Sequence, residues 1–443
     1  MRGSLTMKDN VNRSGRSPAP LDAVHGGARG AGEGRLALNE VASKIRSDFP
    51  LLARRVHDKP LIYFDSANTA QKPAVVIEAV DRYYRQFNAN VARAVHQLGS
   101  EATSAYEGAR DRLARFVNAS SRDEIVLTSG TTQAINLVAW SFALPRLGPG
   151  DEILVTTMEH HANIVPWQLV CERTGARLKV APIDARGELV VADFVAALTP
   201  SVKLAAVTHV SNVLGTINPI AELARAARRR GIPLLVDGSQ GAPHLPVDVR
   251  ALGCDFYALT GHKLFGPTGT GALWARKEIL AAMPPMFGGG EMIREVRFTG
   301  TTFADPPHRF EAGTPNIAGF VGLAAALDYL EALGAARVQA HEAALLDHLS
   351  RALRGVPGLH ICGEAAHKVA LVSFLVEGAH AHDLATLLDH EGVAVRSGHH
   401  CAHPLMQHLG VPATLRASLA FYNTHEEIEQ FVAALVRVRR LLA

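Results

Sequence analysis

The sequence predicts an α/β protein in which helices cover a largely parallel β-sheet. From Leu38 onward, short apolar runs of strand length alternate with helical stretches, and parallel strands need such helical crossovers between them. In addition, 48% of the 443 residues are hydrophobic and 20% are charged. This composition supplies enough apolar side chain for a large core and excludes a chain that is disordered throughout.

The expected strands of the sheet lie in the first two thirds of the chain. We place them at residues 124–128, 152–156, 204–208 and 232–236, which are rich in Val, Leu and Ile. A further apolar run at 272–274 follows a glycine-rich loop. Between these runs the pattern is helical, so each strand is expected to lead into a covering helix.

A smaller α+β unit is expected at the C-terminal end. There the pattern becomes helical at 321–330 and strand-like at 369–376. A last helix begins with the capping-box pattern Thr424-His425-Glu426-Glu427. Its apolar face is formed by Ile428, Phe431, Val432 and Leu435.

These patterns predict three segments along the chain. Residues 1–36 are rich in Gly, Ser and Arg and are expected to form a flexible tail. Residues 60–315 are expected to form the large domain, and residues 38–59 together with 316–443 the small domain.

The net charge and the length of the apolar runs indicate which kinds of binding partner to expect. Lys and Arg total 45 against 42 acidic residues, a net charge of +3, which is too small to predict a nucleic-acid surface. No apolar run reaches the roughly 18 to 20 residues that cross a bilayer, and the N-terminus lacks the apolar core of a secretory signal. We therefore expect a cytoplasmic protein without nucleic-acid or membrane partners.

The first motif that points to a chemical role is Thr128-Ser129-Gly130-Thr131-Thr132, where a strand ends in a turn and a helix begins. Free N–H groups at a helix start attract an anion such as phosphate, and the threonine hydroxyls add donors. An ordinary helix cap is the alternative interpretation.

The second and third motifs are an acid and a lysine that each follow an apolar strand. Asp237 lies at the carboxyl end of its strand, where open α/β sheets bind ligands. It could hold a protonated ring nitrogen or a metal ion, or only cap the next helix. Lys263 lies among Gly, Leu and Phe residues that would desolvate its amine, and a desolvated amine can form an imine with a carbonyl. The alternative is a solvated surface lysine.

The fourth motif is the loop Arg396-Ser397-Gly398-His399-His400-Cys401-Ala402-His403. The chain has four cysteines, widely spaced and without a C-x-x-C pair, so Cys401 is expected to act alone. Cationic neighbours favour its thiolate form. A zinc site is disfavoured because nearly consecutive ligands cannot easily surround one ion, so no metal is expected. An inert buried cysteine is the other alternative.

Together, a phosphate-binding turn, a strand-end acid and a strand-end lysine are the three anchors that pyridoxal 5′-phosphate (PLP) needs. With them, the sequence resembles the SufS-type (group II) cysteine desulfurases of the class V aminotransferase family. The resemblance runs from about Ile45 to the C-terminus. Besides the Asp237 and Lys263 segments, it rests on Tyr63–Ala67, Met158–Trp167, Thr208–Gly215, Phe310–Asn316 and Arg396–Cys401.

The resemblance implies a PLP enzyme of fold type I, with a seven-stranded sheet in the large domain. Lys263 would carry PLP as an imine, Asp237 would pair with the ring nitrogen, His160 would stack on the ring and Gln240 would bond its phenolic oxygen. The phosphate would be held by Thr131, Thr132, Thr260 and His262, with Gly288 and Thr314 supplied by the other subunit of a homodimer.

The implied reaction converts L-cysteine to L-alanine and leaves a persulfide on Cys401. Asn212 and Arg416 would bind the substrate carboxylate, with Arg396 as a further substrate-binding residue. The sulfur would pass to a SufE-like or SufU-like acceptor protein for iron–sulfur cluster assembly. Selenocysteine lyase, a transaminase of the same family and a non-catalytic sulfur carrier are the alternatives.

The sequence also departs from the family pattern. Ala92-Arg93-Ala94 stands where the family usually has His-Arg-Gly, which predicts a different entrance to the site. Thr260 replaces a serine of some relatives and keeps the hydroxyl.

Overall fold

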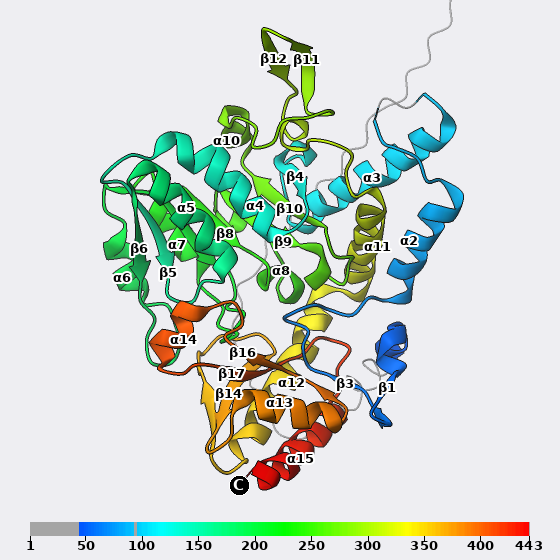
Figure 1. The fold of residues 1–443 in the computed structure, drawn as a ribbon, viewed down its shortest axis with the longest axis vertical. Coiled ribbons are helices and arrows are strands. Elements are labelled where there is room, and N and C mark those ends of the chain that lie inside the picture. Colours follow the sequence, from blue (N-terminus) through cyan, green and yellow to red (C-terminus); the bar gives the residue numbers. More distant parts are fainter. Residues whose placement is uncertain (1–43, 93–94, 443) are drawn as a thin grey trace, which may run out of the picture.

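The computed structural model describes residues 44–92 and 95–442. Figure 1 shows a large α/β body built on a central sheet, with a smaller unit below it that contains the last strands and the C-terminal helix. The predicted tail and residue Ala94 lie outside the described residues. Because most of the motifs follow strands of the central sheet, the topology of this sheet determines which of them meet.

The central sheet has seven strands and is mostly parallel, as predicted. In spatial order these are β4 (Ile125–Thr128), β10 (Gly271–Ala275), β9 (Phe256–Thr260), β8 (Leu234–Asp237), β7 (Val202–Thr208), β5 (Glu152–Thr156) and β6 (Arg177–Ala181). Only β10 runs antiparallel to its neighbours β4 and β9. The ten-residue connection 261–270 that joins β9 to β10 contains no α-helix, and a connection without a crossover helix suits an antiparallel pair.

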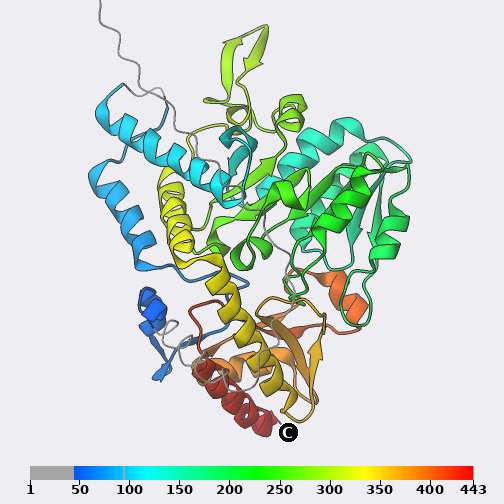
Figure 2. The ribbon, with the colours of Figure 1, turned by 180° about the vertical axis from the view of Figure 1, so that it is seen from behind.

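Both faces of the sheet are buried around β4, β8, β9 and β10, which explains why these strands are nearly continuous apolar runs, whereas the edge strand β6 is partly exposed. In β5, Leu154 packs into one core, whereas Ile153 and Val155 pack into the other. Helices α3 (Gln97–Phe116), α7 (Ile220–Arg228) and α11 (Ile317–Leu333) contribute to the first core, and α4 (Thr131–Val138) and α5 (Val165–Thr174) to the second. Figure 2 shows α11 between the body and the helices α2 (Ala74–Gln86) and α3.

The small domain is built on a four-stranded antiparallel sheet. Its strands, in order, are β13 (Leu359–Cys362), β14 (Leu371–Val376), β17 (Thr414–Ser418) and β16 (Arg396–Gly398), with helices α12 (Ala335–Arg354), α13 (Ala381–His390) and α15 (His425–Leu442). The short strand β3 (Ile62–Tyr63) pairs in parallel with β15 (Val393–Ala394). An early segment of the chain therefore packs with the C-terminal unit, and the domain limits given above stay a prediction.

The capping box at the start of α15 forms as predicted. The Thr424 side chain accepts a hydrogen bond from the Glu427 N–H at 3.3 Å, and Glu427 Oε2 accepts from the Thr424 N–H at 3.0 Å. Ile428, Phe431 and Leu435 are buried, and Val432 is partly buried against the same core.

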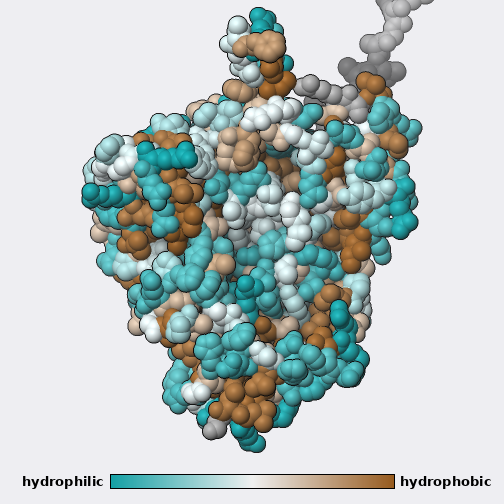
Figure 3. Space-filling view, viewed as in Figure 1, coloured by the Kyte–Doolittle hydropathy of each residue, from teal (hydrophilic) through white to brown (hydrophobic). Residues whose placement is uncertain are grey.

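The remaining elements are short or lie at the surface. They are β1 (Arg55–Val56), β2 (Lys59–Pro60), β11 (Ile293–Arg297), β12 (Gly300–Phe303), α6 (Val191–Ala197), α8 (Gly241–His244), α9 (Val249–Leu252), α10 (Lys277–Ala282) and α14 (His403–Leu409). The hairpin β11–β12 projects from the body with apolar and polar side chains in solvent (Figure 3).

In the part of the chain that the structure describes, no single helix is long and apolar enough to cross a membrane. Helices α11 and α12 reach that length and composition only as a pair, which is bent by 80°, and most of α11 is buried in the protein.

Candidate active site

A cavity of about 410 Å³ lies at the carboxyl ends of β7, β8 and β9 and reaches the small domain. It brings together every expected site residue except Gly288 and Thr314. Its lining includes Thr131, Thr132, His160, Asn212, Asp237, Gln240, Thr260, His262, Lys263, Arg396, Cys401 and Arg416. Residues that are far apart in the sequence meet here because parallel strands end at the same edge of the sheet.

Lys263 ends the short helix η6 (Gly261–Lys263), which follows β9. Protein atoms surround its amine, and this burial lowers the pKa of Lys263 to about 8; the nearby Asp237 carboxylate opposes the shift and Arg416 adds to it. A substantial part of the amine is therefore neutral near physiological pH. The interpretation of Lys263 as a solvated surface lysine is wrong.

Asp237 is the last residue of β8 and is 3% exposed. Its Oδ1 accepts hydrogen bonds from the Ser239 N–H at 2.9 Å and the Ser239 hydroxyl at 2.6 Å. The Ser239 hydroxyl also lies 2.8 Å from Thr131 Oγ1, so it connects the acid to the first residue of α4. Asp237 does not cap the next helix, α8, because the residue before α8 is Gln240 and makes no side-chain cap.

The predicted phosphate turn lies at the start of α4. The N–H groups in the first turn of a helix have no intrahelical acceptor. Among the described residues, no side chain caps the start of α4 either. Gly130 has a φ of +146°, and a Cβ there would lie 3.3 Å from the Thr260 hydroxyl. Glycine thus lets the turn approach Thr260. The arrangement offers main-chain and hydroxyl donors to an anion.

Two histidines that line the cavity are neutral at physiological pH. Burial lowers the pKa of His160 to about 4, and the neighbouring Lys263 contributes to this shift. Burial also lowers the pKa of His262 to about 4. His160 Nδ1 accepts a hydrogen bond from the Ala162 N–H at 3.0 Å, which fixes the orientation of the ring.

A guanidinium is buried at the small-domain wall of the cavity. Arg416 Nη1 donates to the main-chain oxygen of Asn212 at 2.8 Å, and Nη2 donates to Asp65 Oδ1 at 3.2 Å. Burial lowers the pKa of Arg416 to about 10, so it stays charged. Its Nε is buried and has no partner among the described residues. Arg396 Nη1 lies 4.0 Å from Asp65 Oδ2.

Cys401 reaches the same cavity from the loop between β16 and α14. The Asn212 side chain donates to the His400 carbonyl at 2.7 Å, and the His161 N–H donates to the Cys401 carbonyl at 2.8 Å. The Cys401 loop of the small domain therefore binds the large domain through two consecutive carbonyl groups, those of His400 and Cys401. Within residues 44–92 and 95–442, no group of three or more His, Cys, Asp or Glu is arranged to hold a metal ion.

The profile of the family described as aminotransferase class-V matches residues 62–431. The chain belongs to this family. Two curated relatives of this class V aminotransferase are a probable cysteine desulfurase of Xylella fastidiosa, 64% identical over 90% of this chain and 96% of its own length, and the cysteine desulfurase of Cronobacter sakazakii, 51% identical over 90% and 98%.

Solved structures of the family have the same fold. The crystal structure of the cysteine desulfurase CsdA from Escherichia coli, in an S-sulfonic acid form, superposes with a TM-score of 0.85 at 41% identity, covering 91% of this chain and 99% of that one. A C-DES mutant with glycine covalently linked to its PLP cofactor gives 0.78 at 26% identity, covering 88% and 98%. The fold is that of PLP fold-type I enzymes.

PLP is the cofactor of this class V aminotransferase, and the cavity fits it. Lys263 supplies a desolvated amine, Asp237 a buried carboxylate and the start of α4 an anion site. Gln240 Oε1 is buried and finds no hydrogen-bond partner in the described part of the chain, although Gln240 Nε2 donates to the Ala67 carbonyl at 2.6 Å. Unpaired polar atoms in a cavity are expected where a polar molecule binds.

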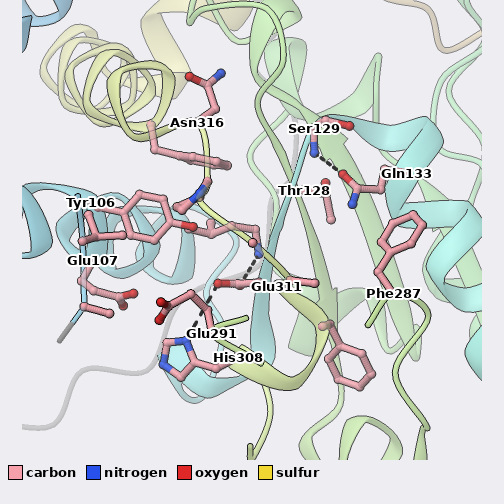
Figure 4. A pocket seen from close by; sticks show the side chains of 18 of the residues that line it. Tyr106, Glu107, Thr128, Ser129, Gln133, Phe287, Glu291, His308, Glu311 and Asn316 are labelled. Atoms are coloured by element: carbon pink, nitrogen blue, oxygen red, sulfur yellow. Dashed lines mark hydrogen bonds and ion pairs between the residues drawn. The ribbon is translucent and has the colours of Figure 1, made fainter. Parts of the chain in front are cut away.

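Gly288 and Thr314 are exposed in this chain and lie outside the cavity. A second cavity of about 450 Å³ adjoins the first and shares Ser129, Gln133 and Gly269 with it. Figure 4 shows Tyr106, Phe287 and His308 around this space. Ala92, the first residue of the unusual Ala-Arg-Ala stretch, also lines it and has a φ of +54°. The second cavity therefore borders the first beside the turn that precedes α4.

Sequence reasoning missed two residues at the site. Asp65 lies in the Tyr63–Ala67 motif, which does not by itself indicate a role for the acid, and it pairs with Arg416. Ser239 lies between Asp237 and Gln240 in the chain, and only the fold shows that its hydroxyl reaches Thr131. An acid before a small-residue turn was the available signal for Asp65, and a serine inside the Asp237 motif was the signal for Ser239.

Proposed function

We propose that this chain is a PLP-dependent cysteine desulfurase that transfers the sulfur of L-cysteine to Cys401 and supplies it for iron–sulfur cluster assembly. The observation that carries the proposal is that Lys263, Arg416 and Cys401 face one cavity of about 410 Å³. A transaminase needs a lysine and a carboxylate-binding arginine, but its chemistry gives no use for a cysteine there.

Arg416 and Asn212 bind and orient the substrate in this proposal. The Arg416 guanidinium is held by Asn212 O and Asp65, which leaves its Nε free to meet an anion. A fixed guanidinium selects amino acids through their carboxylate. Arg396, which is partly exposed beside Asp65, adds positive charge at the same wall.

Lys263 carries the cofactor and then moves a proton. When bound, PLP withdraws electrons from the α-carbon of an amino acid. Asp237 would hold the positive charge of the ring nitrogen, and His160 would stack on the ring. The Lys263 amine, with its pKa lowered to about 8 by burial, is basic enough to accept the α-proton and is partly neutral at physiological pH.

Cys401 then receives the sulfur. Its thiolate attacks the substrate sulfur, so that an S–S bond forms as the C–S bond of the substrate breaks. The net change is a thiol plus L-cysteine to a persulfide plus L-alanine, which balances without an external oxidant or reductant. Lys263 and the charged Arg416 act electrostatically on Cys401, which lines the same cavity.

The cofactor site is completed by a second copy of the chain in this proposal. Gly288 and Thr314 of one subunit would close the phosphate side of the other, where the second cavity adjoins the site. The persulfide would pass to a SufE-like or SufU-like acceptor, because a short loop cannot carry Cys401 far from the cavity. A cytoplasmic location stays a prediction.

The test is an assay of the holoenzyme with L-cysteine and a reductant, in which alanine and sulfide are both quantified. Cys401→Ala is expected to abolish most of the sulfide release while the cofactor spectrum still responds to cysteine. The matched control is Cys362→Ala, a cysteine outside the cavity lining that should leave turnover unchanged. Undiminished sulfide release by Cys401→Ala would refute the acceptor role, and faster cleavage of selenocysteine would favour the lyase.

A further inference from the structure

Three histidine rings stack beside the Cys401 loop. His399 and His403 flank Cys401 in the small domain, whereas His161 begins η5 (His161–Asn163) in the large domain. The ring centroids of His399 and His403 are 3.7 Å apart, and those of His161 and His403 are 4.9 Å apart with an interplanar angle of 7°. Figure 1 shows α14, which begins at His403, lying against the large body. The stack therefore bridges the two domains at the loop.

Two main-chain N–H groups of the loop donate to nitrogens of these rings. The Cys401 N–H donates to His399 Nδ1 at 3.1 Å, and the His403 N–H donates to His161 Nε2 at 3.0 Å. An imidazole nitrogen accepts a hydrogen bond only when it carries no proton. Protonation of either nitrogen would place two N–H groups against each other.

The loop backbone depends on such restraints. His400 and Cys401 have φ values of +53° and +56°, a left-handed conformation that is unfavourable for residues with a Cβ. Two consecutive residues in this region persist only where the surroundings hold them. Besides the two bonds to the rings, the loop is held by Asn212 and by the His161 N–H, and these contacts do not depend on ring protonation.

Burial and the neighbouring groups oppose protonation of the stack. Burial is the main cause that lowers the pKa of His161 and of His399, followed by the neighbouring histidines, and Arg396 also acts on His399. His160 lies next in the chain, and Lys263 and Arg416 face Cys401. Among the described residues, none of the three rings forms an ion pair with a carboxylate. A proton on the stack thus gains no anionic partner.

We propose that His161 and His399 are positioning residues, stacked through His403, that fix the main chain of Cys401 only while their rings are neutral. The inference rests on the proposed function of Cys401 as sulfur acceptor. With neutral rings, the loop presents the sulfur to the substrate. Protonation removes the bonds to the Cys401 and His403 N–H groups and loosens the loop, so that the partly exposed sulfur moves away from its position in the cavity wall.

Amide hydrogen exchange of the PLP-loaded protein, read by mass spectrometry and corrected for intrinsic exchange, tests this. Peptides that contain residues 400–404 are expected to lose protection by roughly tenfold between about pH 8 and about pH 5.5, whereas peptides from β5 keep theirs. His161→Phe and His399→Phe keep an aromatic ring but no acceptor. Each should show the loosened loop already at about pH 8, with little further change on acidification.

His408→Phe is the matched control, because His408 lies on the exposed side of α14 outside the stack. It should keep the wild-type profile. Equal protection of the wild-type loop at both pH values, or a wild-type profile in both His161→Phe and His399→Phe, would overturn the inference. The readout needs no turnover of cysteine. A protein that shows this profile but releases no alanine from cysteine would refute the proposed function and not the role of the histidines.

Discussion

Arg416 Nη2 lies 3.2 Å from Asp65 Oδ1, and this ion pair joins residues 351 positions apart in the sequence. Arg416 comes from β17 in the small domain, and Asp65 follows the short strand β3 near the start of the described chain. Burial raises the pKa of Asp65, and the Arg416 and Arg396 cations oppose that shift. The pair turns the guanidinium toward the cavity.

Replacing Asp65 with Asn should therefore weaken substrate binding more than it slows chemistry. The amide removes the charge that orients Arg416, so we expect the KM for L-cysteine to rise about tenfold with a smaller change in kcat, because a hydrogen bond to a charged group is typically worth 1.5–3 kcal/mol. Steady-state kinetics of alanine formation measure this. Asp81→Asn, which breaks the exposed pair Asp81–Arg85 on α2, is the control. An unchanged KM would show that Asp65 does not position Arg416.

Ser239→Ala should weaken cofactor binding. The change removes the hydroxyl that connects Asp237 Oδ1 with Thr131 Oγ1, so the dissociation constant for PLP should rise about three- to tenfold. Titration of the apoprotein, followed by absorbance, measures it. Ser201→Ala removes a similar bond to Glu152, at 2.7 Å and outside the cavity lining, and should leave PLP affinity unchanged. Equal affinities in all three proteins would contradict the prediction.

The buried lysine makes the stability of the apoprotein depend on pH. The pKa of Lys263 is about 8 in the folded chain and has its ordinary value of 10.5 in the unfolded chain, so the unfolded chain binds more protons between these values. The cost of burying the charged amine is present in full below about pH 8 and disappears as pH rises to 10.5.

Lys263→Met lacks this cost, so it should be more stable than wild type near pH 7 by about 3 kcal/mol. The advantage should shrink as pH approaches 10. Urea unfolding of both apoproteins at the two pH values measures the difference. A constant difference across this range would mean that the amine is solvated in the folded chain.

The projecting hairpin β11–β12 should contact a partner subunit. Phe298 and Val296 are exposed although they are large and apolar, and exposed apolar clusters beside a site often mark an interface. Phe298→Asp is expected to shift a dimer toward monomer in sedimentation experiments and to lower PLP affinity. Leu441→Asp places the same charge on an exposed leucine of α15 and should leave the assembly intact. A wild-type monomer would contradict the proposed shared site.

The parts of the site that local patterns specify were predictable from the sequence. Asp237 and Lys263 follow continuous apolar runs, and a run buried on both faces indicates a central strand whose carboxyl end meets the ligand. The capping box at Thr424 was equally local. Resemblance to the family added the roles of His160 and Arg416, which periodicity does not indicate.

Contacts between distant segments could not be predicted in this way. The ion pair of Asp65 with Arg416 and the stacking of His161 on His403 depend on how the small domain sits on the sheet. The direction of strand β10 could not be predicted either, because an apolar run indicates a strand but not whether it runs parallel or antiparallel to its neighbours. The direction of β10 follows from the connection 261–270, which contains no crossover helix. In the sequence, this loop stands out for Lys263 and not for the missing helix.

The central claim is that Lys263 carries the cofactor. The most direct measurement is reduction of the PLP-loaded protein with borohydride, followed by peptide mapping of the pyridoxyl group by mass spectrometry. The label should be on Lys263, at about one per chain, and absent from Lys263→Met. Lys72 is the informative competitor, because burial also lowers its pKa to about 8. A label on Lys72, or no label on a protein saturated with PLP, would contradict the account.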